Sequence, residues 1–214
     1  MGKWLRFPDT TGNGTLSEAK LMQGKSRWIL PAPWAAQIVM ALWLPYTLLN
    51  LLFPGPALTY ALGLVIALLA LISLKLAYIP AIGMYPHIPS RESMVVLAIL
   101  TLFIPFALLI GRGQPWDWLG NMVYAPASAL GQELYFRSAL LTAFGTHRSR
   151  RAILLQATLF ALWHARAFRV VPAWEALLVL LGTFVAGILW GWQVRRDSTT
   201  FYAFIQHLLF LIVQ

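Results

Sequence analysis

Cysteine is absent from this chain of 214 residues, and charged side chains make up only 11% of it. Without cysteine there are no disulfides, no thiolate metal ligands and no cysteine nucleophile. Acidic side chains are scarcest, with seven Asp and Glu against sixteen Lys and Arg. Because 59% of the residues are hydrophobic and ten are tryptophan, the composition excludes an ordinary soluble globular protein.

The sequence contains several long apolar segments with few charged residues. Several of them reach about 20 residues, the length that crosses the hydrocarbon core of a bilayer as a helix. They predict an all-α membrane protein, a bundle of about seven transmembrane helices behind a short polar N-terminal tail at residues 1–27. The predicted spans are 28–53, with a kink at Pro45, 57–79, 93–110, 119–144, 152 through His164, 174–194 and 198–214.

The basic residues follow the predicted membrane topology. A net charge of +9 is compatible with nucleic-acid binding, but these residues are scattered over the loops, so we expect membrane lipid and no nucleic acid as partner. With the N-terminus in the cytoplasm, three basic residues lie outside: Arg112, Arg166 and Arg169. Twelve lie inside: Lys3, Arg6, Lys20, Lys25, Arg27, Lys75, Arg91, Arg148, Arg150, Arg151, Arg195 and Arg196.

One apolar span carries an acid and a base four residues apart, Glu133 and Arg137. At that spacing the two side chains share a helical face and can pair directly. A charge at membrane depth costs several kcal/mol even on lenient scales, so it needs a partner and usually has a function. A buried ion pair that only fixes helix register is the structural alternative.

Two histidines, His164 and His207, lie in other spans at a similar depth. From the cytoplasmic ends of their helices, Glu133 and His164 are about 20 Å along and His207 is about 14 Å along. All three fall within the hydrocarbon layer, so we predict that they line a shared cavity. Taken singly, each histidine has a structural explanation as an interfacial, core or interhelical hydrogen-bonding group.

A carboxylate with two imidazoles supports three chemistries. Glu133 can act as a general base on water while the histidines stabilise an oxyanion. The same groups are a common ligand set for a catalytic zinc, and they can also relay protons or ions. No Ser stands in a G-x-S-x-G pattern, and no second acidic residue lies near enough to suggest a paired-aspartate protease. Spacing alone leaves the three open.

The ordered motifs resemble those of the CPBP family, the CAAX-protease and bacteriocin-processing (ABI) intramembrane proteases. The resemblance covers about residues 119–214 and includes the glycine-rich stretch at 187–192 with the two arginines that follow it. The motifs that carry it are Glu133-x-x-x-Arg137, Phe160-x-x-x-His164 and His207. The remaining membrane helices, 28–110, lie before this CPBP-like core.

The resemblance implies an intramembrane endopeptidase that cleaves a membrane-associated peptide or protein without a metal or other cofactor. Glu133 would be the general base, oriented by Gln132 and Arg137. His164 would help to bind the water, and His207 would face the oxyanion. We expect an integral protein of a bacterial cytoplasmic membrane.

Two positions depart from the family pattern. The motif usually begins Glu-Glu, where this chain has Gln132, and the third-motif histidine is usually followed four residues later by Asn or Asp, where it has Leu211. These departures favour the alternative of a catalytically inactive scaffold or assembly subunit within a membrane protein complex. A proton-coupled transporter is a third hypothesis, but no inverted repeat or pair of broken helices supports it.

The charge distribution generates the first prediction, a cytoplasmic N-terminus and, after seven spans, a C-terminus on the far side of the membrane. Reporter proteins fused to either end would measure this directly. A C-terminal reporter that is active in the cytoplasm would contradict it.

Overall fold

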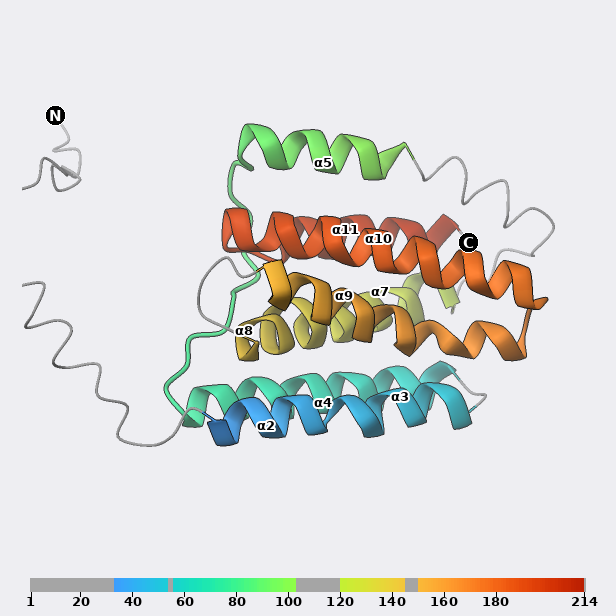
Figure 1. The fold of residues 1–214 in the computed structure, drawn as a ribbon, viewed down its shortest axis with the longest axis horizontal. Coiled ribbons are helices and arrows are strands. Elements are labelled where there is room, and N and C mark those ends of the chain that lie inside the picture. The colour runs from blue at the N-terminus through green and yellow to red at the C-terminus, as the bar shows by residue number, and fades with distance from the viewer. Residues whose placement is uncertain (1–32, 54–55, 103–119, 145–149, 214) are drawn as a thin grey trace, which may run out of the picture. The chain divides into compact units, whose positions relative to one another are not determined.

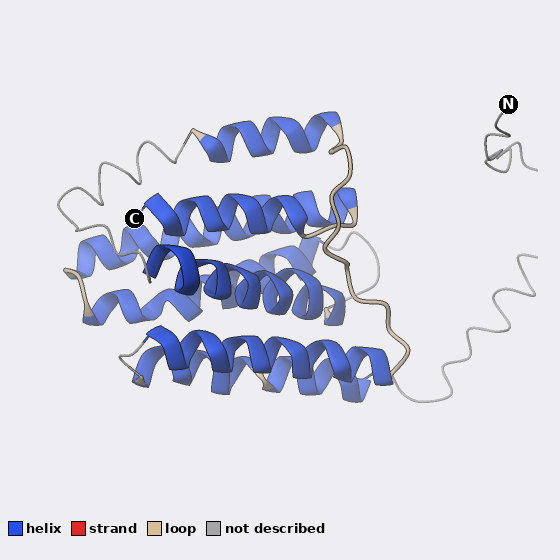
Figure 2. Ribbon diagram, turned by 180° about the vertical axis from the view of Figure 1, so that it is seen from behind, coloured by secondary structure: helices blue, strands red, loops and turns tan. Residues whose placement is uncertain are grey.

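The computed structural model describes residues 33–53, 56–102, 120–144 and 150–213, and these are almost entirely helical (Figures 1 and 2). The predicted all-α class is therefore confirmed. The predicted tail at 1–27 and the loop at 111–118 lie outside the described residues. The helices are α2 (Pro33–Ala41), α3 (Trp43–Leu52), α4 (Pro56–Leu76), α5 (Arg91–Thr101), η1 (Gly120–Tyr124), α7 (Ala125–Gln132), η2 (Glu133–Leu140), α8 (Leu141–Ala143), α9 (Arg150–Trp163), η3 (His164–Arg169), α10 (Ala173–Asp197) and α11 (Phe201–Val213).

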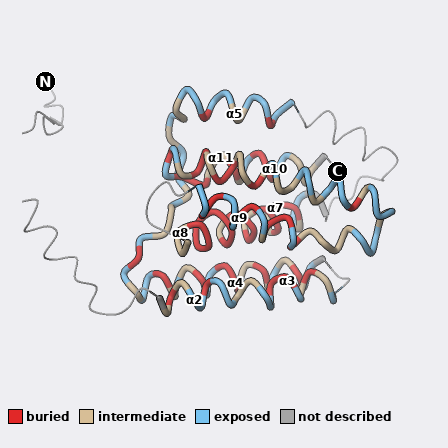
Figure 3. The backbone as a smooth tube through the Cα atoms, viewed as in Figure 1, coloured by how far each residue is buried: buried red, intermediate tan, exposed pale blue. Residues whose placement is uncertain are grey.

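The helices lie roughly parallel to one common axis, and successive membrane-length spans, with α2 and α3 counted as one, run in alternating directions (Figure 1). Helix α4 packs on α7 and η2, α9 on α10, and α11 on α7. Buried residues concentrate on the central helices α7 to α9, whereas α5 and the outer faces of α4 and α10 are largely exposed (Figure 3). The core therefore lies along the helix that carries Glu133.

Three helical segments are long and apolar enough to cross a membrane: Trp34–Leu52, Ala57–Leu76 and Ala173–Asp197. Their outward side chains are apolar, as at Leu68, Leu69 and Ile72 on α4, each about half exposed. Such a surface suits lipid and would be unusual on a soluble monomer. Seven crossings remain a prediction.

The break between α2 and α3 has a local cause in Pro45. Proline lacks an N–H donor and its ring clashes with the carbonyl four residues earlier, which here belongs to Ala41. Helix α2 ends at Ala41 and α3 begins at Trp43. The helix is thus interrupted at Leu42, one turn before Pro45, whereas the kink itself remains a prediction.

Helix α4 ends at Leu76, three residues earlier than the predicted span. Tyr78 adopts a left-handed conformation with φ 57°, and the N–H of Ile79 donates to the carbonyl of Leu74 at 2.9 Å. The N–H of Tyr78 donates to Lys75 at 3.0 Å. This pair of bonds is a Schellman motif, which closes the helix before Pro80.

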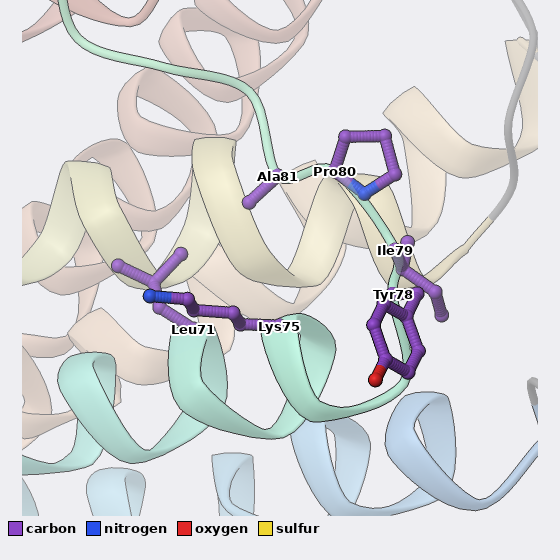
Figure 4. Close-up of a pocket in the computed structure, with 6 residues that line it drawn as sticks. All are labelled: Leu71, Lys75, Tyr78, Ile79, Pro80 and Ala81. Carbon is purple, nitrogen blue, oxygen red and sulfur yellow. The ribbon is translucent and has the colours of Figure 1, made fainter.

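A shallow groove lies beside this helix end (Figure 4). Its walls are apolar except for the ammonium of Lys75 and the phenol of Tyr78. The lining residues are Leu71, Lys75, Tyr78, Ile79, Pro80 and Ala81, none of which belongs to the predicted polar site.

The extended segment that follows α4 is fastened to the start of α11. Gly83 pairs with Thr199 as an isolated β-bridge, and the N–H of Thr200 donates to the carbonyl of Gly83 at 3.0 Å. The hydroxyl of Thr199 donates to the carbonyl of Tyr85 at 2.7 Å. We call this set of contacts the 83–199 clasp; it joins segments more than a hundred residues apart.

Two predicted boundaries near His164 and after α10 need correction. The residues after His164, predicted as a loop, continue as the 3-10 helix η3 to Arg169. Helix α10 extends to Asp197, where Ser198 with φ 56° ends it.

Close approach of α9 and α10 depends on Gly187. A Cβ atom on Gly187 would lie 3.0 Å from the Cα atom of Ala157, a contact tighter than most Cβ atoms make, so the backbone of α9 would have to move by a few tenths of an ångström. Gly182, on the same helix, has nothing within 4 Å of the corresponding position. The small residue is therefore required for packing at one position and not at the other.

We predict that Gly187→Ala and Gly182→Ala change stability in opposite directions. Overpacking at Gly187 should cost about 1–3 kcal/mol, whereas Ala at Gly182 should gain about 0.5–1 kcal/mol from its higher helix propensity. Thermal melting of the two purified variants in one detergent would measure this. Equal melting temperatures would contradict the close packing of α9 on α10.

Candidate functional site

Glu133 and Arg137 are fully buried in η2 and face each other. Arg137 Nε lies 3.4 Å from Glu133 Oε2, and both side chains have no exposed surface. The predicted pairing is therefore confirmed. The helix is π-helical here, so that the N–H of Leu141 reaches back five residues to Phe136. Such widened turns occur frequently at functional sites.

His207 on α11 is the second partner of Glu133. Its Nδ1 lies 2.7 Å from Glu133 Oε1, and the imidazole is buried. An ionised carboxylate only accepts, so Nδ1 is the donor. Because Arg137 already balances the negative charge, this bond needs only a neutral ring, whose Nε2 keeps a lone pair. Segments 74 residues apart thus meet at one carboxylate.

The guanidinium of Arg137 lies between aromatic rings. Its Cζ is 3.8 Å from the centroid of Phe160 and 5.2 Å from that of Trp190. These ring faces attract the cation. Within the described residues, Nη1 and Nη2 have no hydrogen-bond partner, so the guanidinium retains unused donors beside Glu133.

His164 joins this cluster through Phe160, without direct contact to Glu133. Its Nδ1 lies 2.9 Å from the carbonyl oxygen of Phe160, so Nδ1 donates and Nε2 keeps a lone pair. The Phe160 ring lies 4.7 Å from the His164 ring and 5.8 Å from the His207 ring, centroid to centroid. The structure therefore brings the predicted groups into one region, but the histidine in direct contact with Glu133 is His207.

Gln132 points elsewhere than expected. Its Nε2 donates to Ser128 Oγ at 2.8 Å, one helical turn earlier, and the side chain is buried. The expected orienting contact to the Glu133 carboxylate is replaced by this bond. Leu211, one turn after His207, is partly buried and offers no polar atom.

The described residues contain no group of three or more His, Asp or Glu side chains arranged to hold a metal ion. His164 stands apart from the contact between Glu133 and His207, so the three do not converge on one point. The polar cluster is therefore arranged as a hydrogen-bonded carboxylate rather than as a ready set of metal ligands.

Trp190 also belongs to this cluster, although none of the sequence motifs includes it. Its ring stacks on that of His207, with centroids 5.2 Å apart and planes 23° apart, and Trp190 is buried. Interfacial tryptophans lie near the ends of a span. Trp190 lies seven residues before Asp197, the last residue of α10, a position that separates it from the interfacial class.

A family model described as type II CAAX prenyl endopeptidase Rce1-like matches residues 90–213, more than half of the chain. The matched stretch includes all four residues of the site, Glu133, Arg137, His164 and His207. Comparisons with curated proteins and with solved structures gave no match. Together with the long apolar helices, the family match indicates an integral membrane protein.

The buried pair generates a stability prediction. Glu133→Ala leaves Arg137 without its counter-charge, and breaking a buried pair in this way costs about 3–5 kcal/mol. Glu133→Gln keeps the shape and should be milder. Thermal melting in detergent would measure both variants.

The control is Glu92, whose carboxylate lies 2.9 Å from Arg196 in an exposed ion pair. Glu92→Ala should leave the melting temperature nearly unchanged, because exposed pairs contribute little. If Glu133→Ala melts as Glu92→Ala does, the 133–137 pair is not held in a dry environment.

Proposed function

Because the chain belongs to the type II CAAX prenyl endopeptidase Rce1-like family, we propose that it is an intramembrane endopeptidase for a membrane-associated peptide or protein. The observation that supports this most is the buried carboxylate of Glu133, held between Arg137 and His207. A charge that costs this much to bury, with one oxygen that accepts no hydrogen bond within the described residues, suits a catalytic base.

Glu133 Oε2 is the proposed proton acceptor. Oε1 accepts from His207, whereas Oε2 has no hydrogen bond within the described residues. Oε2 takes a proton from water, the hydroxide attacks the scissile carbonyl carbon, and the proton then passes to the leaving amine as the C–N bond breaks. No cofactor is needed to balance these steps.

The other polar groups orient the water and the charges. The Nε2 lone pair of His164 accepts the second hydrogen of the water, and Arg137 supplies the counter-charge of Glu133. His207 holds the carboxylate through Nδ1 and can donate to the oxyanion only when Nε2 also carries a proton. Leu211 adds no oxyanion donor, so we expect slow cleavage.

An inactive scaffold or assembly subunit is the second candidate. Its support is the bond of Gln132 to Ser128 and the apolar side chain of Leu211, which together remove two polar groups from the pattern described above. In that case the Glu133–Arg137 pair would fix helix packing.

The proposal includes a topology. Seven crossings, with the N-terminal side in the cytoplasm of a bacterial cell, fit the alternating directions of the successive helical spans (Figure 1). The clasped end of the bundle, with Arg150, Arg151, Arg195 and Arg196, then faces the cytoplasm.

We predict that Glu133→Gln and His164→Ala abolish cleavage of candidate membrane substrates while both variants still accumulate in membranes. Losing a general base lowers rates by about 10²–10⁴. Cleavage should continue in strong chelators. Loss of activity on chelation, with recovery on adding zinc, would favour a metal site instead.

A double substitution that restores the family pattern distinguishes a weakened protease from an inactive scaffold. Gln132→Glu with Leu211→Asn should raise the rate, because one oxyanion donor is worth about 10²–10³ in rate. If wild type and the double variant both cleave nothing, and Glu133→Gln preserves the biological role, the endopeptidase proposal is wrong.

A further inference from the structure

Trp190 touches both groups that flank the buried carboxylate. One contact is the parallel stacking on His207 described above. The other is Arg137, whose Cζ lies 5.2 Å from the indole centroid. A single side chain on α10 therefore sets the positions of two partners of Glu133, one on α11 and one on η2.

The indole is itself held by Gln206. Trp190 Nε1 donates to Gln206 Oε1 at 2.9 Å, and Gln206 Nε2 donates to the carbonyl of Leu97 at 2.7 Å and to Thr101 Oγ1 at 3.2 Å. Because an indole N–H can only donate, the amide oxygen must face Trp190 and the amide nitrogen must face α5. Every polar atom of the two side chains thus has a partner.

Gln206 also precedes His207 directly on α11. Its side chain is buried and joins three helices, α5, α10 and α11, at the depth of the site. A polar bridge with all its bonds made inside a membrane protein defines one arrangement of its helices. Packing alone would be satisfied by an aliphatic residue here, so the amide indicates a requirement for orientation.

We propose that Trp190 and Gln206 are positioning residues that hold the His207 ring with Nδ1 facing Glu133, and that α5 acts on the site through them. Stacking fixes the plane of the imidazole, and the hydrogen bond to Gln206 fixes the indole. An effect of Trp190 and Gln206 on catalysis rests on the proposed function. Their effect on the orientation of the His207 ring does not.

The experiment reads the His207 ring directly. The chain contains four histidines, so ¹⁵N-histidine labelling of the full-length protein in detergent gives a small set of imidazole signals. His207 is assigned by its loss in His207→Gln. In wild type we expect a protonated Nδ1 and an unprotonated Nε2.

Trp190→Phe keeps an aromatic ring but removes the N–H donor, and Gln206→Leu removes the bridge to α5. Both should convert the single His207 form into exchanging tautomers, while the His164 signals stay unchanged. Trp192→Phe is the matched control, because Trp192 is a partly buried tryptophan two residues further along the same helix. If one variant does not fold, the other carries the test.

In a cleavage assay, Trp190→Phe and Gln206→Leu should lower kcat about tenfold with little change in KM, because they displace groups around the base without touching the substrate. Trp192→Phe should cleave as wild type does. Changed His207 signals in a protein that cleaves nothing would support the positioning role and count against the proposed function alone, so the two failures are distinguishable. Unchanged His207 signals in both variants, or a wild-type ring protonated at Nε2 alone, would overturn this inference.

Discussion

The negative charge of Glu133 is the constraint around which the described helices are arranged. No bulk water is available at that depth to solvate it, so its compensation has to come from the protein. Arg137 supplies the counter-charge from one turn away, and His207 supplies a donor from α11. Arg137 in turn rests on the faces of Phe160 and Trp190. Four helical segments are thus tied to one carboxylate.

The need to stabilise the buried guanidinium of Arg137 explains why aromatic side chains lie on the inner faces of α9 and α10. A buried guanidinium with unused N–H groups is tolerated better against ring faces than against aliphatic ones, because the ring quadrupole offers negative charge. Phe160 meets both histidines as well as Arg137. The ring therefore separates the two imidazoles while keeping them in the same cluster.

Much of this could be predicted from the sequence where the cause is local. A spacing of four residues was enough to pair Glu133 with Arg137, and Pro45 was enough to interrupt the first apolar run. The position of each residue along its helix predicted that His164 and His207 lie at nearly the same depth as Glu133. That position does not determine the direction in which each side chain points around the helix axis. Which histidine makes the contact depends on helix rotation, and the π-helical geometry of η2 has no signature in the sequence.

The remaining misses have different origins. Trp190 differs from an interfacial tryptophan only in its distance from the helix end, and its stacking partner comes from another helix. Tyr78 at positive φ, which ends α4 early, is equally unexpected because glycine is the usual residue at such a position. A tertiary contact decides the first case. The second depends on a local backbone motif at a residue type that rarely adopts it.

The 83–199 clasp shows that the boundary of the family match differs from the boundary of the folded unit. The family match begins at residue 90, yet the threonines that start the His207-bearing helix are bonded to backbone at residues 83 and 85. Helix α4, earlier still, packs against the segment that carries Glu133. The unit recognised by homology is therefore smaller than the unit that folds. A fragment cut at residue 90 would preserve every motif and lose part of the scaffold that holds those motifs together.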